Sequence, residues 1–370
     1  MRSLKAQFGI VPLEACNDRG IYPAMGFAAQ ALEVMDRSTV KQANTFVKRV
    51  QTAMADAANM HGLRLELQAA THFTRRGHRV SWPKAVPGGT FDLLIEDLGP
   101  SGLEVECKSI SESKGRSIHR REALDFWGLI WTDLEGVARN LKAGLAVVLT
   151  LPNRLPDDAG KRASLAQQVV ARILVGSGAR LDDGADVRIT AFDSTRIKAA
   201  MSSDPTEFRE AVATATATTN REAALYGTQA GGLLAFVVQS SREDKVLNEV
   251  FATLADSAPR QFTGTRGGMF WVALQGLDAG SLLTVAGQDN DPAQSSTGLA
   301  LEVSQFLSTG APNYVIGVAF ASKSTLVPTV NGDTDSGGST YCFPNKGSPK
   351  WDPSFSGLFS ASGEASQGAS

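Results

Sequence analysis

The sequence predicts an α/β protein, in which helices and strands alternate along most of the 370 residues. A continuous apolar run at 143–152 is typical of a strand buried on both faces of a sheet, and a further strand is expected at 313–322. Stretches with helical periodicity lie between such strands. A turn rich in glycine, at 99–102, joins two shorter strands.

The first part of the chain is predicted to be helical. Residues 27–58 are rich in alanine, follow a helical period and contain no proline, which favours one or two helices. A further helix is expected over 59–77, because apolar residues recur on one stripe and Gly77 suits the C-terminal cap. The elements expected next are strands at 78–82, 91–97 and 103–111, a helix at 122–141 and a strand at 143–152.

The chain is longer than one hydrophobic core usually serves, so the sequence predicts two main domains. Alternating helices and strands continue past the polar stretch at 201–219, which is read as a helix or a linker. The expected division is an N-terminal helical segment at 1–56, a first α/β domain at 57–200, a second at 201–359 and a low-complexity, disordered tail at 360–370.

The composition is that of an ordinary globular protein, with 42% apolar and 20% charged residues and a net charge of −2. This charge excludes a generally basic nucleic-acid coat, so any DNA-binding surface must be a local patch. The three cysteines are far apart in sequence, which suits a reducing compartment. No apolar run is long enough to span a membrane, and charges interrupt the N-terminus too often for a signal peptide. We therefore expect a cytoplasmic protein without a membrane partner.

The two strands at 91–97 and 103–111 combine acidic residues and a lysine with side chains that are otherwise typical of a buried sheet. In the second strand charged and apolar residues alternate at the two-residue period. An antiparallel register centred on Pro100 pairs Asp92 with Lys108 and Leu94 with Glu106. Because side chains alternate between faces, Asp92, Glu106 and Lys108 are expected on one face of the sheet.

Asp92 and Glu106 are diagonal neighbours in this register, so they can share one divalent cation. Carboxylate oxygens are the ligands that Mg²⁺ prefers, and Mn²⁺ accepts the same donors. A lysine beside such an ion can orient a water molecule or offset charge on a phosphate. The alternative is a solvated strand face with a weak ion pair. The apolar elements around the hairpin favour the metal site, because buried charges are costly unless they are paired or bind a metal.

At these residues the sequence resembles the PD-(D/E)XK nuclease superfamily, which includes restriction endonucleases and Holliday-junction resolvases. The resemblance covers roughly residues 57–151 and extends to the order helix, strand, strand, strand, helix, strand. Asp92 matches the family's metal-binding Asp, and Glu106 and Lys108 match its Glu-x-Lys. Glu66, on the preceding helix, matches an additional acid that many members place beside the metal.

The resemblance implies a restriction-endonuclease-like core, a central mixed sheet flanked by helices, followed by a second α/β region with a regulatory or assembly role. It also implies an endonuclease that uses Mg²⁺ or Mn²⁺ to hydrolyse DNA. Asp92, Glu106, Lys108 and Glu66 would be catalytic, and all of these except Lys108 would hold the metal. Bacterial defence against phage or plasmid DNA is the biological setting that the architecture suggests.

Basic residues cluster on both sides of the hairpin, where they are well placed to track a phosphate backbone. The alternative for each is an ordinary solvated loop residue. The predicted DNA-binding residues are Arg75, Arg76, Lys114, Arg116, His119, Arg120 and Arg121.

Three alternatives to a defence nuclease are open at this point. They are a DNA repair or recombination nuclease, a non-catalytic nucleic-acid-binding subunit on a nuclease-like fold, and a nuclease held silent in a larger complex. The second half carries Gln239 and Ser241 where a duplicated site would need Glu and Lys, so it is expected to be catalytically silent. We expect it to support a homo-oligomer or a complex with a partner protein.

Overall fold

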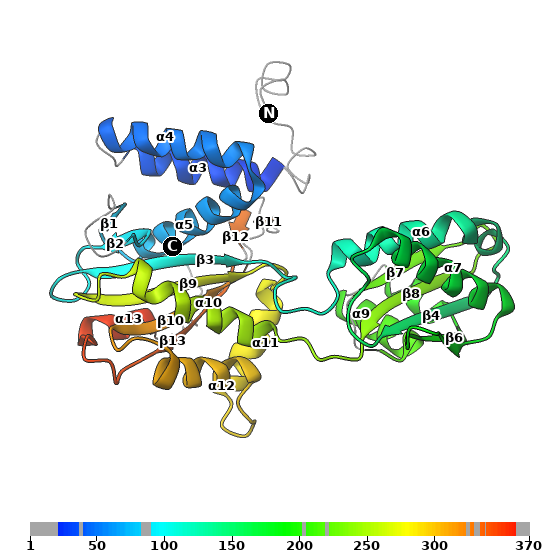
Figure 1. Ribbon diagram of the computed structural model, residues 1–370. Helices are drawn as coiled ribbons and strands as arrows, with labels where there is room; N and C mark the ends of the chain where they lie inside the picture. Colours follow the sequence, from blue (N-terminus) through cyan, green and yellow to red (C-terminus); the bar gives the residue numbers. More distant parts are fainter. Residues whose placement is uncertain are drawn as a thin grey trace, which may run out of the picture. The chain divides into compact units, whose positions relative to one another are not determined.

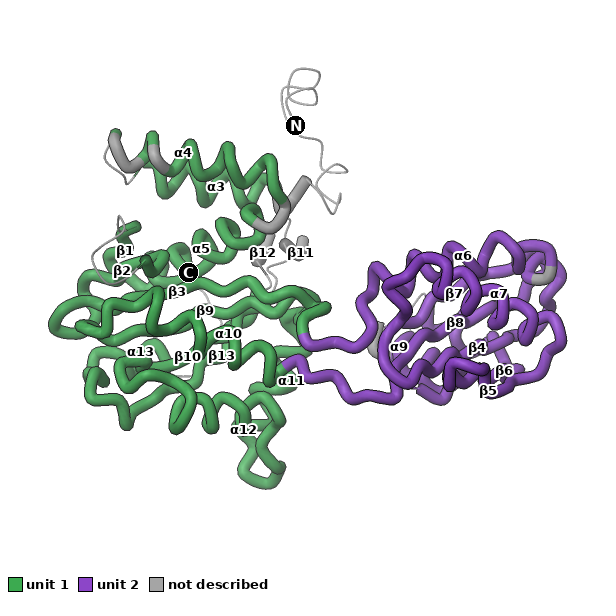
Figure 2. The backbone as a smooth tube through the Cα atoms, viewed as in Figure 1, with its two compact units in different colours: residues 1–114, 247–370 green, residues 115–246 purple. Residues whose placement is uncertain are grey.

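The computed structural model describes residues 21–36, 40–82, 90–201, 205–218, 222–322, 326–328, 334–336 and 338–359. The chain forms two compact units (Figure 2). Unit 1 combines residues 1–114 with 247–370, and unit 2 comprises residues 115–246. The predicted tail at 360–370 lies outside the described residues. No helix in the described ranges is long and apolar enough to cross a membrane.

The division differs from the expected domains at 57–200 and 201–359. Residues 115–200 belong to unit 2, and residues 247–359 return to unit 1. Unit 2 is therefore inserted into unit 1, and the expected boundary near residue 200 falls inside it. The α/β class itself is confirmed, since both units contain a mixed sheet flanked by helices.

Unit 1 is built on a six-stranded sheet whose strand order is β1-β2-β3-β9-β10-β13 (Figure 1). Strands β3, β9 and β10 are parallel to one another, and the other neighbours pair antiparallel. The strands are β1 (Val80–Ser81), β2 (Leu93–Ile95), β3 (Leu103–Ile110), β9 (Gly267–Leu274), β10 (Val315–Ala321) and β13 (Thr340–Pro344).

Helices cover both faces of this sheet. Helix α5 (Ala57–Arg75) packs its apolar stripe on one face, where Phe73 contacts Trp271 of β9 with ring centroids 5.6 Å apart. Successive strand residues face opposite ways, so Phe270 points to the other face. There it contacts Phe306, which follows α12 (Gly298–Gln305), and α10 (Val246–Gln261) covers the same face.

The N-terminal segment is helical, as predicted, over α3 (Ile21–Asp36) and α4 (Val40–Ala55). These two helices pack on α5 through a small apolar cluster that includes Phe46 and Ala53 of α4 and Leu67 of α5. Other elements of unit 1 are α11 (Ala279–Asn290), α13 (Ser356–Phe359) and the small pair β11 (Leu326–Pro328) and β12 (Thr334–Ser336).

The hairpin of β2 and β3 forms as predicted, but its register differs by two residues. Leu94 pairs with Glu104 instead of Glu106. The β2–β3 ladder ends at the pair Ile95 and Leu103, so the turn between the strands is longer than expected, and the amide of Glu96 donates to the carbonyl of Arg79 beside β1 at 2.9 Å. The longer turn ends at Gly102, whose φ of 88° suits glycine. A shift of two residues keeps every side chain on its face.

Unit 2 contains a five-stranded sheet of order β5-β6-β4-β8-β7, in which only β4 and β8 are parallel. Helices α6 and α7 pack on one face through a core that includes Phe126, Val169 and Phe236, and α8 and α9 pack near Leu233. The strands are β4 (Gly144–Leu151), β5 (Ala179–Arg180), β6 (Asp186–Phe192), β7 (Ala223–Gly227) and β8 (Leu233–Ser240); the helices are α6 (Arg120–Arg139), α7 (Ala159–Val175), α8 (Thr195–Ala200) and α9 (Pro205–Thr216).

The helix at 122–141 and the strand at 143–152 form as α6 and β4, but they do not complete the sheet of the hairpin as the sequence suggested. They belong to unit 2. Helix α10 and strand β9 take their place, and β9 pairs with β3 along its whole length, from Leu103 to Ile110.

The two chain segments that connect unit 2 to unit 1 are fastened to each other, and we call them the neck. The amide of Lys245 donates to the carbonyl of Gly115 at 2.7 Å. The guanidinium of Arg116 pairs with Asp244 at 2.8 Å, and the amide of Ser117 also donates to that carboxylate. Gly115 has a φ of 73°, and a Cβ there would lie 2.6 Å from the Lys245 carbonyl oxygen. Only glycine fits this crossing.

We expect residues 115–246, expressed alone, to unfold in one cooperative transition, because unit 2 has its own sheet and core. A chain that ends near Ser203 should not fold cooperatively, because it lacks β8, β9 and β10. Urea unfolding followed by circular dichroism measures both.

A Gly115→Ala variant of the full chain should lose about 1–3 kcal/mol of unfolding free energy, whereas Gly128→Ala, in open space on α6, is the control.

A cooperative transition in the chain that ends near Ser203 would contradict this division, as would the absence of one in residues 115–246.

Candidate functional site

Strand β3 supplies the two residues at the centre of the site. Glu106 is only 3% exposed, and its neighbour Lys108 is half-buried. They lie on the same face of the strand, so Lys108 Nζ reaches Glu106 Oε1 at 2.6 Å. The pairing of β3 with β9 fixes this segment along its whole length, whereas β2 pairs only with Leu103 to Val105.

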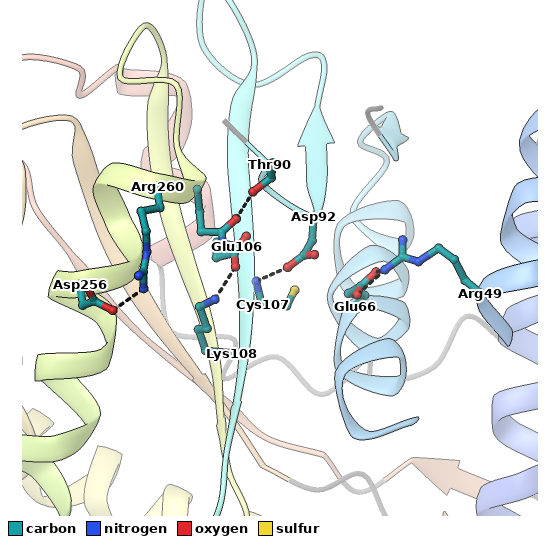
Figure 3. Close-up of polar contacts among 10 residues, drawn as sticks. Arg49, Glu66, Thr90, Asp92, Glu106, Cys107, Lys108, Asp256 and Arg260 are labelled. Carbon is teal, nitrogen blue, oxygen red and sulfur yellow. Dashed lines mark hydrogen bonds and ion pairs between the residues drawn. The ribbon is translucent and has the colours of Figure 1, made fainter. Parts of the chain in front are cut away.

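Asp92 lies immediately before β2, where its backbone and side chain are both held by β3. Its amide donates to the Val105 carbonyl at 3.1 Å, and its Oδ2 accepts from the Cys107 amide at 2.9 Å. The corrected register places Asp92 beside Glu106 rather than opposite Lys108. Figure 3 shows Asp92 between Glu106 on one side and Glu66 on the other.

Glu66 projects from α5 and is 6% exposed. A residue that the sequence did not indicate, Arg49 of α4, binds it: Nη2 of Arg49 lies 2.6 Å from each carboxylate oxygen (Figure 3). Arg49 follows no motif and is 17 residues from its partner. Only the packing of α4 on α5 brings the two side chains together, so sequence spacing alone held no signal for it.

Burial dominates the titration of the three carboxyls. It raises the pKa of Glu106 from 4.5 to about 8, with help from the negative charge of Asp92 and against the opposing effect of Lys108. Burial likewise raises the pKa of Glu66 to about 7; the charge of Asp92 adds to this rise and Arg49 opposes it. The pKa of Asp92 is also raised by burial, although the Cys107 amide counteracts the rise.

One oxygen of Glu106 provides the test of whether the site suits a cation. Glu106 Oε2 is buried and accepts from no donor, although the Asp92 carboxyl is close enough to hydrogen-bond to Glu106 when one of the two is protonated. A buried carboxylate oxygen without a partner is costly, and a divalent cation would satisfy it. Asp92 offers a second carboxylate beside it, and oxygen donors suit Mg²⁺ or Mn²⁺. The residues present therefore fit a divalent cation held by Asp92 and Glu106.

Within the described ranges, no group of three or more Asp, Glu, His or Cys side chains is close enough to hold a metal ion. Glu66 is coupled to Asp92 electrostatically, but its oxygens are occupied by Arg49. Asp92 and Glu106 thus form a pair, and the predicted role of Glu66 as a third ligand is not realised in this arrangement.

The neighbouring acid on β3, Glu104, is fully buried and has a structural role. Its oxygens accept from the amide of Thr263 at 2.8 Å and from the Thr263 hydroxyl, and Arg266 pairs with it at 3.3 Å. Both partners come from the loop between α10 and β9. Glu104 is therefore committed to anchoring this loop, and it offers no free oxygen to the site.

Helix α10 borders the site on the other side (Figure 3). The last residue of α10, Gln261, binds the segment that leads to Asp92: its carbonyl accepts from the Thr90 amide at 2.8 Å, and its side chain accepts from the Thr90 hydroxyl. Arg260 pairs with Asp256 one turn earlier on the helix. The predicted domain boundary near residue 200 placed α10 in the second domain, so these residues were not predicted to lie near the site.

The predicted DNA-binding residues divide between the two units. In unit 1, Arg75 is exposed, whereas Arg76 donates to the Gly357 carbonyl at 3.2 Å and Lys114 donates to Thr253 of α10 at 2.5 Å. The other four belong to unit 2: Arg116 is fastened to Asp244 in the neck, and His119, Arg120 and Arg121 are exposed around the start of α6.

Comparisons with protein-family models, with curated proteins and with solved structures found no match to this chain.

We expect the metal-free protein to lose several kcal/mol of stability as the pH rises from about 5 to about 8, because a pKa shift of one unit corresponds to about 1.4 kcal/mol. The pKa values of Glu66 and Glu106 are raised from 4.5 to about 7 and about 8, so the folded state binds more protons than the unfolded state in this window. Their stabilising contribution is complete below 4.5 and is lost as the pH passes the raised values. Urea unfolding in EDTA at several pH values measures this.

Glu106→Gln should flatten this pH dependence, because it removes the carboxyl with the larger rise. Glu135→Gln is the control, since Glu135 is half exposed in an ion pair with Arg139. Stability that is constant or rises over this window would show that the carboxyls are compensated in the folded state.

Proposed function

We propose that this chain is a metal-dependent nuclease that hydrolyses DNA phosphodiester bonds, using Mg²⁺ or Mn²⁺. The observation that carries the proposal is the half-buried Asp92 beside the buried Glu106, with Lys108 Nζ 2.6 Å from Glu106 Oε1 and the other Glu106 oxygen bound by no donor. A solvated strand face would leave these groups exposed, and a structural ion pair would satisfy all of their oxygens, as Glu104 illustrates.

The topology of unit 1 supports the same proposal. When unit 2 is regarded as an insertion, the elements follow the order α5, β1, β2, β3, α10 and β9. This is the order helix, strand, strand, strand, helix, strand that the resemblance to the PD-(D/E)XK superfamily implies. The last helix and the last strand in this order, α10 and β9, follow unit 2 in the sequence.

The residues of the site have distinct roles in this proposal. Asp92 and Glu106 would hold the ion, which when bound polarises a phosphate oxygen and lowers the pKa of a water molecule. The Cys107 amide orients Asp92 for this task. With Glu106 holding the ion, the ammonium of Lys108 would no longer be needed to neutralise Glu106. It could then contact a phosphate oxygen or the attacking water and offset negative charge there.

The biological setting that we favour is defence against phage or plasmid DNA, and repair or recombination is the alternative for a nuclease. We further propose that the chain works as a homo-oligomer or with a partner protein, since one active site cuts one strand at a time and a duplex break needs two sites.

A non-catalytic nucleic-acid-binding subunit is the second candidate. It is favoured by the ion pairs that engage Glu66 and Glu106 and by the lack of a group of three metal-binding side chains among the described residues.

We expect purified full-length protein to cleave DNA in Mg²⁺ or Mn²⁺ and not in EDTA. Asp92→Asn, Glu106→Gln and Lys108→Met should each lower the rate by about 100-fold or more, because each removes a metal ligand or the adjacent charge. The assay compares supercoiled, linear and single-stranded DNA on gels.

Glu96→Gln is the matched control for these variants, because Glu96 lies on the same hairpin but is exposed and pairs only loosely with Arg79 at 3.8 Å. Metal-dependent DNA binding without cleavage would favour the non-catalytic subunit. Equal loss of activity in Glu96→Gln and Glu106→Gln would remove the special role of Glu106.

Arg120→Gln together with Arg121→Gln should weaken DNA binding and lower the salt slope of log K by about 1 for each phosphate that the variant no longer neutralises. Fluorescence anisotropy at several salt concentrations measures this slope. Arg116→Gln should instead lower the stability of unit 2, because Arg116 is bound to Asp244 in the neck. An unchanged slope in the double variant would remove the start of α6 from the DNA interface.

A further inference from the structure

The contact between Arg49 and Glu66 has the geometry of a bound cation. A single nitrogen, Nη2, lies 2.6 Å from Oε1 and 2.6 Å from Oε2. A carboxylate that binds a divalent cation through both oxygens holds it in the same place, on the line that bisects them. The guanidinium therefore occupies the two oxygens that Glu66 would present to a metal ion.

The two partners are held very differently. The side chain of Glu66 is 8% exposed, whereas that of Arg49 is 42% exposed. Glu66 is fixed by α5, whose neighbouring residues Leu65 and Leu67 are buried in two apolar clusters. Arg49 approaches from α4, which rests on α5 and α3 through a small cluster. Of the two side chains, Arg49 is the one that can leave.

Asp92 connects this ion pair to the proposed metal site. It is close enough to Glu66 for their charges to interact, and it lies beside Glu106 (Figure 3). With Arg49 in place, the cation has two carboxylates available, from Asp92 and Glu106. With Arg49 displaced, Glu66 is free to become a third ligand on the side of α5.

We propose that Arg49 is a positioning residue that withholds Glu66 from the metal ion, so that docking or release of α4 sets how tightly the site binds its cation. This inference rests on the proposed nuclease function and adds a regulatory role for the N-terminal helices. The docked arrangement is the weakly binding form, and displacement of Arg49 gives the tightly binding form.

The test is the affinity of the full chain for Mn²⁺ without DNA, measured by isothermal titration calorimetry at pH 8.5. Arg49→Gln should bind Mn²⁺ about tenfold more tightly than the natural protein, because a positive charge leaves the site and a carboxylate joins it. Arg49→Met, which keeps the apolar stem and removes the charge, should show the same gain and serves if Arg49→Gln does not fold.

Two further variants make the test specific. Lys48→Gln removes the same charge from the adjacent, exposed position on α4, so its affinity should change by less than about twofold. Arg49→Gln combined with Glu66→Gln should lose the gain, because the third ligand is then absent. An affinity in Arg49→Gln and Arg49→Met that is equal to or weaker than that of the natural protein would overturn the inference.

The result also separates this inference from the proposed function. If the natural protein and the Arg49 variants all fail to bind Mn²⁺, the proposed metal site itself is wrong. If the natural protein binds Mn²⁺, if Asp92→Asn abolishes that binding, and if Arg49→Gln brings no gain, the metal site stands and only the role of Arg49 is rejected.

Discussion

The burial of two acidic side chains on β3 is the constraint on which the rest of unit 1 depends. Glu104 and Glu106 lie two residues apart on the same face of β3, which pairs with β9 along its whole length, yet they are compensated in different ways. Glu104 is satisfied by Thr263 and Arg266, which ties the loop after α10 to the sheet. Glu106 keeps one oxygen without a partner and a raised pKa. The first acid stabilises the fold, whereas the second holds unfavourable energy that a ligand can relieve.

The positions of most helices and strands could be predicted from the sequence, because apolar periodicity reports which residues are buried. It does not report which element buries them. The runs that form β4 and β9 are equally apolar, so either can lie beside β3, and proximity in sequence favours β4. In fact β3 pairs with β9, which follows unit 2 in the sequence. Nothing local in residues 103–111 distinguishes these two partners, and this is why the domain boundaries could not be found.

The site shows the same division between local and tertiary information. Alternation along β3 was sufficient to place Glu106 and Lys108 on one face, and the error of two residues in the register of β2 left that result unchanged. The carboxylates were found because charged residues stand out within apolar strands. Arg49 and Gln261 were not found, because their positions depend on how α4 and α10 pack rather than on any spacing from the motif.

The neck also bears on how the chain reaches its native state. Ser109 and Gln275, which hydrogen-bond beside the site, are 166 residues apart. During synthesis β3 emerges long before β9, so one of its edges has no native neighbour until all of unit 2 has been made. Unit 2 can fold first, and its folding brings Gly115 within hydrogen-bonding distance of Lys245. The loop that must close between β3 and α10 is then short, which reduces the entropic barrier to assembling the sheet.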